Sequence, residues 1–199
     1  MPAQSTDGDQ LPTSGAGRTE RVFPDTATLY PISLADLVLR MAEAGMFELV
    51  WSDHLLAEVE RILTERKGLT EAQSAYFVGC IRDAFPEGLI ATAEYLPLVA
   101  TRRGPDPGDH AHSAAAVAGR ATIVLSADRR GFPPDDIAPA RRRHPDAYLT
   151  GLLRRYPADV LGIVDAMGAS LRVPLARPQV LRRLAAAGIP AFAALAETL

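Results

Sequence analysis

Hydrophobic and polar positions recur at helical spacing along much of the chain. Residues 34–45 (LADLVLRMAEAG) carry apolar side chains every three or four positions and end at Gly45, a natural helix stop. A second helix is predicted over 53–68, where Ser52 is a good N-cap. A third is predicted over 70–83. These three segments indicate amphipathic helices packed on a core.

Short apolar runs between these helices predict strands. They are Arg-Val-Phe before Pro24, MFELVW at 46–51, GLIATAEYL at 88–96 and ATIVLS at 121–126. The last is a continuous apolar run with β-branched residues, typical of a buried parallel strand. Because helices alternate with these strands, the sequence predicts a three-layer α/β/α fold with a central parallel sheet.

The two ends of the chain differ from this middle part. Residues 1–20 are rich in Ser, Thr, Gly, Pro and Gln and lack apolar periodicity, which predicts a disordered tail. After about residue 145 only helical patterns remain. The predicted organisation is a tail at 1–20, an α/β domain at 21–144 and a C-terminal helical extension at 145–199.

Composition narrows the functional classes. The single cysteine, Cys80, excludes an internal disulfide and a cysteine-based zinc cage, and it fits a reducing cytoplasm. No apolar run approaches the ~18 residues of a membrane span. We therefore expect a cytoplasmic protein with no membrane partner. The net charge is −3, but arginines cluster locally. Solvated surface and phosphate contact both account for such clusters.

Three aspartates stand where the predicted fold gathers ligands. Asp25 follows the first strand, and Asp128 follows the run 121–126 after one residue. Asp109 opens an alanine-rich helix at 110–119, where the helix dipole favours a carboxylate. In parallel α/β sheets, ligands bind beyond the carboxyl ends of the strands. The three acids are therefore candidates for one site.

Each acid also has a purely structural interpretation. Asp109 alone is more often a helix cap, and Asp128 could serve a turn. Glu58 lies at one edge of the apolar stripe of its helix, and Glu60 lies equally near the other edge. Helix geometry does not choose between the two glutamates.

Four segments, taken in order, carry a family resemblance. They are DTATLYPISLADLVLRMAEAG, WSDHLLAEVERIL, PDPGDHAHSAAA and IVLSADRRGFP. Together they resemble the PIN-domain family, specifically its branch of VapC-like toxins, over roughly residues 21–150. The helical tail is similar to the extension of that branch. The resemblance implies an endoribonuclease that uses Mg²⁺ or Mn²⁺ and acts as the toxin of a type II toxin–antitoxin pair. It also implies an RNA substrate, a small antitoxin partner and, as is common in the family, a homodimer.

The resemblance also assigns roles to individual residues. Asp25, Glu58, Asp109 and Asp128 match the catalytic, metal-binding acids, and the match selects Glu58 over Glu60. Asp106 is the weaker competitor of Asp109. The hydroxyl position before the last acid is occupied by Ser126. Phosphate contacts would come from Arg129 or Arg130, facing the RNA backbone.

The chain departs from the family pattern at three positions. Ala27 stands where many members have Asn, Pro24 precedes the first acid, and Gly131 stands where an acid is common. These departures motivate an alternative, a catalytically inactive PIN fold that serves as an interaction or regulatory module.

Three aromatic side chains near these motifs are given structural roles. His110 and His112 are two positions apart on a helix and so do not share a face. We interpret Trp51 as a core residue.

Overall fold

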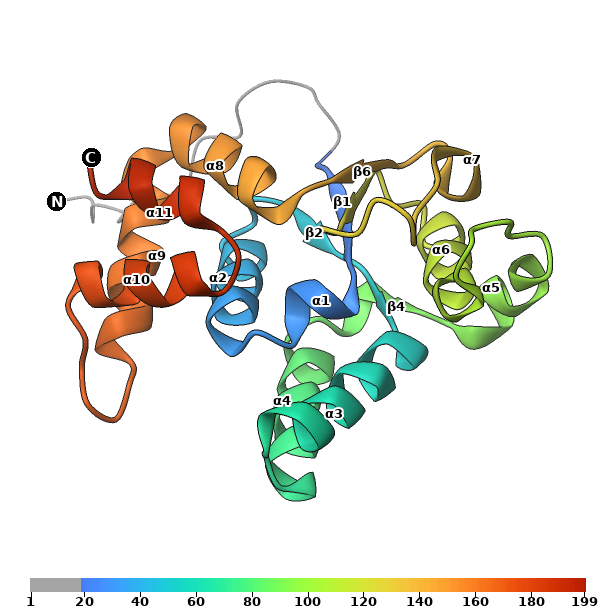
Figure 1. Ribbon diagram of the computed structural model, residues 1–199, viewed down its shortest axis with the longest axis horizontal. Helices are drawn as coiled ribbons and strands as arrows, with labels where there is room; N and C mark the ends of the chain where they lie inside the picture. The colour runs from blue at the N-terminus through green and yellow to red at the C-terminus, as the bar shows by residue number, and fades with distance from the viewer. Residues whose placement is uncertain (1–18) are drawn as a thin grey trace, which may run out of the picture.

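Four parallel strands form the central sheet of the protein (Figure 1). The computed structural model describes residues 19–199, so most of the predicted tail lies outside the described residues. The strand order is β2-β1-β5-β6, and β3 and β4 form a separate parallel pair. The strands are β1 Arg21–Pro24, β2 Glu48–Leu49, β3 Trp51–Ser52, β4 Leu89–Ile90, β5 Ile123–Leu125 and β6 Arg141–Arg143.

The pairing of β1 with β5 sets the edge of the sheet that matters for function. Phe23 pairs with Val124 and Pro24 with Leu125 in the register, and all four residues are buried. Because the strands are parallel, their carboxyl ends meet at one edge. As predicted, β1 ends at Pro24.

Helices surround this sheet, and α2 and α6 lie on opposite sides of β1 in Figure 1. The predicted α/β fold with a central parallel sheet and C-terminal helices is confirmed. The α-helices are α1 Thr26–Leu29, α2 Ile32–Glu43, α3 Asp53–Lys67, α4 Glu71–Ala84, α5 Thr92–Val99, α6 His110–Ala118, α7 Pro134–Ile137, α8 Pro145–Arg155, α9 Pro157–Ala169, α10 Arg177–Ala186 and α11 Pro190–Ala196. Two 3₁₀ turns, η1 Pro86–Gly88 and η2 Pro107–Asp109, complete the list.

Local capping chemistry fixes the helix ends that the sequence predicted. The Ser52 hydroxyl accepts a hydrogen bond from the Leu55 N–H at 3.2 Å and starts α3. Gly68, with φ of 68°, ends that helix in the left-handed conformation that glycine adopts without strain. Thr70 and Gln73 form a capping box at the start of α4.

The predicted strand over 88–96 is wrong beyond its first residues. Only Leu89–Ile90 is extended, and α5 begins at Thr92. The Glu94 carboxylate accepts a hydrogen bond from the Ala91 N–H at 3.2 Å, which stabilises the start of a helix. Alanine, glutamate and leucine also favour helix over strand.

Two features of the strands could not be predicted from apolar runs in the sequence. The run 46–51 was predicted as one strand but contributes to both sheets, as β2 and β3. The strand β6 consists of three arginines at the edge of the sheet. Because an edge strand is only partly covered, its side chains need not be apolar.

The C-terminal helices α8–α11 pack on one another, and α9 and α10 contact α2. Their shared interior includes Val160, Val164, Leu184 and Phe192, all fully buried. Within residues 19–199, no helix is long and apolar enough to cross a membrane.

Candidate functional site

Asp25 lies at the carboxyl end of β1 and caps the short helix α1. Its Oδ1 accepts hydrogen bonds from the Thr28 N–H at 2.8 Å and the Thr28 hydroxyl at 2.7 Å. Its Oδ2 accepts a short hydrogen bond from the Ser126 hydroxyl, which follows β5. The residue is only 5% exposed. Burial raises the pKa of the Asp25 carboxyl, and the hydrogen bonds from Ser126 and Thr28 oppose that rise.

Glu58 reaches the same region from α3. Its Oε2 accepts a hydrogen bond from the Thr26 hydroxyl at 2.8 Å and lies 2.6 Å from Nε2 of His112. The imidazole therefore donates from Nε2 to the carboxylate. This hydrogen bond, with that from Thr26, lowers the pKa of Glu58 to about 2 against the opposing effect of burial. The His112 ring is 2% exposed and its Nδ1 has no partner among the described residues.

Asp109 and Asp128 approach each other from different segments. Asp109 ends η2, is half-buried, and accepts no hydrogen bond through its carboxylate within residues 19–199. Burial and the negative charges of Asp106, Asp128 and Glu58 raise its pKa to about 6, while His112 opposes the rise. Asp128 is exposed, and its Oδ1 accepts a hydrogen bond from the Arg130 N–H at 2.7 Å.

Gly131 provides the space in which these two carboxylates meet. A Cβ atom at this position would lie 2.2 Å from Asp109 Oδ2 and 3.2 Å from Asp128 Oδ2. The first distance is far below van der Waals contact. The missing side chain at Gly131, where the family commonly has an acid, is therefore what lets the Asp109 carboxylate lie where it does.

The four predicted acids thus lie around one end of the sheet, but they do not converge on one point. Within residues 19–199, no three His, Cys, Asp or Glu side chains are placed closely enough to hold a metal ion. The donor set itself fits Mg²⁺ or Mn²⁺, because it consists of carboxylate oxygens with a hydroxyl beside them. The raised pKa and unpaired carboxylate of Asp109 also fit a missing positive charge.

The purely structural role proposed for each acid holds for some of them and not for others. Asp109 makes no capping hydrogen bond, whereas Asp106 accepts one from the Gly108 N–H at 2.8 Å and serves the turn. Asp128 does act in a turn, through its bond to Arg130. On α3, it is Glu58 that bonds to side chains of α1 and α6.

Ser126 was predicted from the sequence, but Thr26, Thr28 and His112, which also bond to Asp25 or Glu58, were not. Thr26 and Thr28 are buried on either side of the exposed Ala27, so hydroxyls adjoin the position where the family has Asn. His112 was set aside because it does not share a helix face with His110. The two indeed have different partners, since His110 bonds to a backbone carbonyl at 2.8 Å.

A usable signal for His112 was its spacing of three positions from Asp109, the N-cap residue of α6, which brings the two towards one side of that helix. The core assignment of Trp51 is confirmed. Its side chain is 2% exposed and donates to the Phe85 carbonyl at 2.8 Å.

Two known protein families match this chain. The profile of the PIN domain matches residues 21–130. The chain belongs to the PIN-domain family. The profile of the VapC50 C-terminal domain matches residues 145–198, so this PIN protein carries the C-terminal part of a VapC-like protein. Neither a curated protein nor a solved structure matches the chain. PIN and VapC proteins are typically nucleases, and PIN domains generally use divalent metal ions.

Proposed function

We propose that this PIN protein is a metal-dependent endoribonuclease, the toxin of a type II toxin–antitoxin pair. The observation that carries the proposal is the pair Asp109 and Asp128, whose carboxylates meet over Gly131 without an intervening positive side chain. Two carboxylates so close, with Glu58 also raising the pKa of Asp109, repel one another unless a cation lies between them.

Asp25, Glu58, Asp109 and Asp128 would hold Mg²⁺ or Mn²⁺ at the carboxyl edge of the sheet. When bound, the cation supplies Lewis acidity that favours ionisation of water and offsets charge on the scissile phosphate. Ser126 and Thr28 orient Asp25, and Thr26 with His112 orients Glu58.

The remaining roles follow from the same arrangement. Glu58, held ionised by these donors, would accept a hydrogen bond from the attacking water and orient it, since its lowered pKa makes it a weak base. Arg129 and Arg130 are exposed on the loop that also carries Asp128, where they would contact RNA phosphates.

The test is cleavage of a mixed single-stranded RNA substrate with Mn²⁺, with Mg²⁺ and with EDTA. Wild type and Asp25→Asn are compared with Asp83→Asn, which removes an exposed acid on α4. Metal-dependent cleavage that is lost only in Asp25→Asn supports the proposal. Cleavage that survives Asp25→Asn contradicts the assignment of the site.

The inactive module is the second candidate, and one observation favours it. Among the described residues, no three acidic side chains lie close enough together to hold a metal ion. Calorimetric titration with Mn²⁺ separates the two proposals. A nuclease binds Mn²⁺ and loses binding in Asp109→Asn, whereas an inactive module binds weakly in both.

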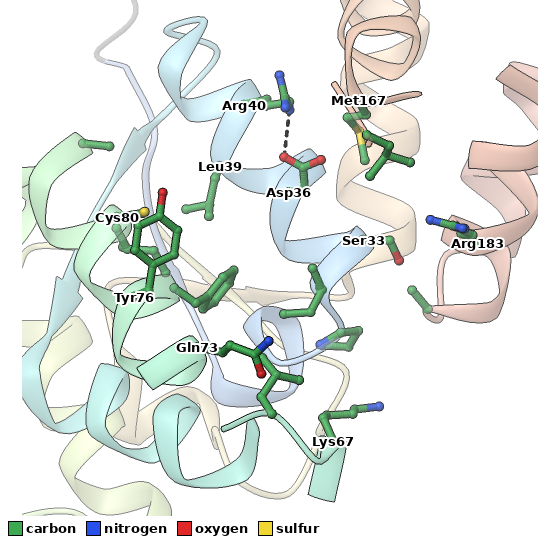
Figure 2. Close-up of a pocket in the computed structure, with 18 of the residues that line it drawn as sticks. Ser33, Asp36, Leu39, Arg40, Lys67, Gln73, Tyr76, Cys80, Met167 and Arg183 are labelled. Carbon is green, nitrogen blue, oxygen red and sulfur yellow. Dashed lines mark hydrogen bonds and ion pairs between the residues drawn. The ribbon is translucent and has the colours of Figure 1, made fainter. Parts of the chain in front are cut away.

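The VapC family implies a small antitoxin partner, and a groove outside the candidate site offers it a place. A groove of about 920 Å³ runs between α2, α4 and the helices α9 and α10. Figure 2 shows Tyr76 and Cys80 on one wall and Met167 and Arg183 on the other. None of the candidate site residues lines it. We propose that an apolar helix of the antitoxin lies here.

This partner assignment has its own measurement. Tyr76, 75% exposed, is replaced by Asp, and Leu96→Asp on α5 is the control because Leu96 is exposed but lies outside the groove. Binding of the small protein encoded beside this chain should weaken only in Tyr76→Asp. A homodimer that dissociates in Tyr76→Asp would instead assign the groove to a second copy.

The proposed division of labour follows the sequence boundaries. Residues 21–144 would form the nuclease unit and residues 145–199 an extension that completes the groove through α9 and α10. As an RNA-cleaving toxin, the protein would act in the cytoplasm.

A further inference from the structure

A second, smaller hollow of about 430 Å³ lies beside the loop that carries Ser126 and Asp128. Three arginines line it, Arg129 from that loop and Arg141 and Arg142 from β6. We call it the arginine hollow. Arg142 donates from Nη1 to the Ser126 carbonyl at 2.8 Å, which ties the hollow directly to the candidate site.

Arg129, Arg141 and Arg142 line the hollow without a compensating acidic partner among the described residues. Within residues 19–199, none of them forms an ion pair with an Asp or Glu, although five other arginines of the chain do. Like charges placed together on a surface repel one another, so this arrangement costs free energy in the absence of an anion. The arrangement therefore favours a ligand that supplies several negative charges.

The floor of the hollow indicates what part of a ligand is recognised. Phe132 and Ile137 line it but are almost completely buried, at 2% and 1% exposure. The Phe132 ring is therefore not open for base stacking. Planar guanidinium groups match phosphate oxygens in pairs. The chemistry thus suits a phosphate backbone and not a base.

We propose that the arginine hollow is a phosphate-binding subsite that holds the RNA strand beside the scissile bond. The inference rests on the proposed nuclease function and adds Arg141 and Arg142 to the residues that contact RNA. In the register of β6 with β5, Arg141 lies opposite Ile123 and Arg142 opposite Val124, so it is the bond from Arg142 to the Ser126 carbonyl that connects the hollow to the carboxyl edge. RNA backbone held there would continue directly into the site of the acids.

The test measures RNA binding separately from cleavage. Single-stranded RNA is titrated, by fluorescence anisotropy, onto the full chain carrying Asp25→Asn, over a series of potassium chloride concentrations. Arg129→Ala/Arg141→Ala is compared with Arg154→Ala/Arg182→Ala, which removes the same charge from exposed positions on α8 and α10. Arg141→Lys tests whether the planar fork matters beyond the charge.

The expected loss is roughly fivefold in affinity per arginine at ~0.1 M salt, because each single-strand phosphate contact contributes a slope of about 0.7. The slope of log Kd against log salt should fall by about that amount per arginine. The loss should be similar for different RNA sequences, since backbone contacts do not read bases. Arg154→Ala/Arg182→Ala should change neither quantity appreciably.

Three results would overturn the inference. The first is equal binding and equal salt slope in the hollow and control variants. The second is no RNA binding by the parent chain. The third is an Arg141-dependent rise in melting temperature with inorganic phosphate but no effect on RNA, which would assign the hollow to a small phosphate ligand.

Cleavage by the wild type, measured in parallel, shows which proposal has failed. If the wild type cleaves RNA but the hollow variant behaves as the control does, only the subsite is wrong. If the wild type binds RNA through these arginines without cleaving it, the subsite stands and the nuclease assignment is wrong.

Discussion

The two halves of the candidate site are built in different ways. Side chains hold both Asp25 and Glu58: Ser126 and the neighbouring Thr28 bond to Asp25, and Thr26 and His112 bond to Glu58. Asp109 and Asp128 have no such support, and they meet over Gly131. We refer to these pairs as the supported half and the unsupported half. The fold orients the carboxylates of the first pair in advance, whereas the two carboxylates of the second pair repel each other.

The pKa shifts of Glu58 and Asp109 are opposite in sign, whereas burial raises the pKa of Asp25 as it does that of Asp109. Donors lower the pKa of Glu58 to about 2, whereas burial and neighbouring negative charge raise that of Asp109 to about 6. Ionised Glu58 therefore stabilises the fold, and ionised Asp109 opposes it. A cation at the proposed site would offset the second effect, so its binding would stabilise the fold through Asp109.

The largest expected effect compares one acid from each half. Both Asp25→Asn and Asp109→Asn should lower RNA cleavage by at least about a hundredfold, because each removes a carboxylate from the proposed metal site. Near neutral pH, Asp109→Asn should raise the melting temperature of the metal-free protein, whereas Glu58→Gln should lower it. Equal melting temperatures for Asp109→Asn and wild type in EDTA would break the comparison.

The next effect concerns the imidazole that supports Glu58. His112→Leu should lower cleavage about 10- to 100-fold, as loss of a group that orients a metal-binding residue does. It should also destabilise the protein by about 1–3 kcal/mol, because Thr26 alone then satisfies the half-buried carboxylate. His112→Gln, which keeps a donor, should recover part of the cleavage at unchanged KM. Full activity in His112→Leu would remove this residue from the supported half.

A pH series sharpens the contrast through opposite signs. Asp109 has its pKa raised from 3.8 to about 6, so the cost of its ionisation is present above about pH 6 and vanishes below 3.8. The advantage of Asp109→Asn in metal-free melting should shrink over that window. Glu58 has its pKa lowered from 4.5 to about 2, so its stabilisation is present above 4.5 and fades as the pH falls towards 2. The advantage of wild type over Glu58→Gln should therefore decline only below pH 4.5.

The smallest expected effect is that of Gly131→Ala. The added Cβ would displace the Asp109 carboxylate, which is the end of a short, movable side chain, so folding should change little. Mn²⁺ affinity measured by calorimetry should fall by about tenfold, the low end of the 10- to 100-fold range for changes around metal ligands. Unchanged affinity would show that Asp109 does not need its present position.

Local chemistry explains which parts of this fold could be predicted from the sequence. Ser52 and Thr70 mark helix starts because capping needs only neighbouring residues. The strand ATIVLS was visible because a buried parallel strand is apolar throughout. The segment 92–99 was misassigned because its apolar content fits either structure. The three arginines of β6 gave no strand signal at all.

The four acids and Ser126 could be predicted from the sequence, but the bond between His112 and Glu58 could not. The order of the acids carried the family resemblance, and Asp25 and Ser126 follow paired strands as parallel topology requires. The bond between His112 and Glu58 joins α6 to α3 across 54 positions. No local pattern contains that information, since it arises only when the two helices pack.

The separation of 101 positions between Asp25 and Ser126 has a consequence for how the protein is made. A ribosome releases β1 early, yet the strand that precedes Ser126 follows only after the six helices α1–α6 and the second sheet have been translated. A growing chain, or a fragment that stops before Leu125, contains Asp25 with its local bonds to Thr28 but lacks the Ser126 hydroxyl. If the protein is the proposed toxin, it would be harmless during most of its own synthesis, because its nuclease centre would be completed by a segment translated late.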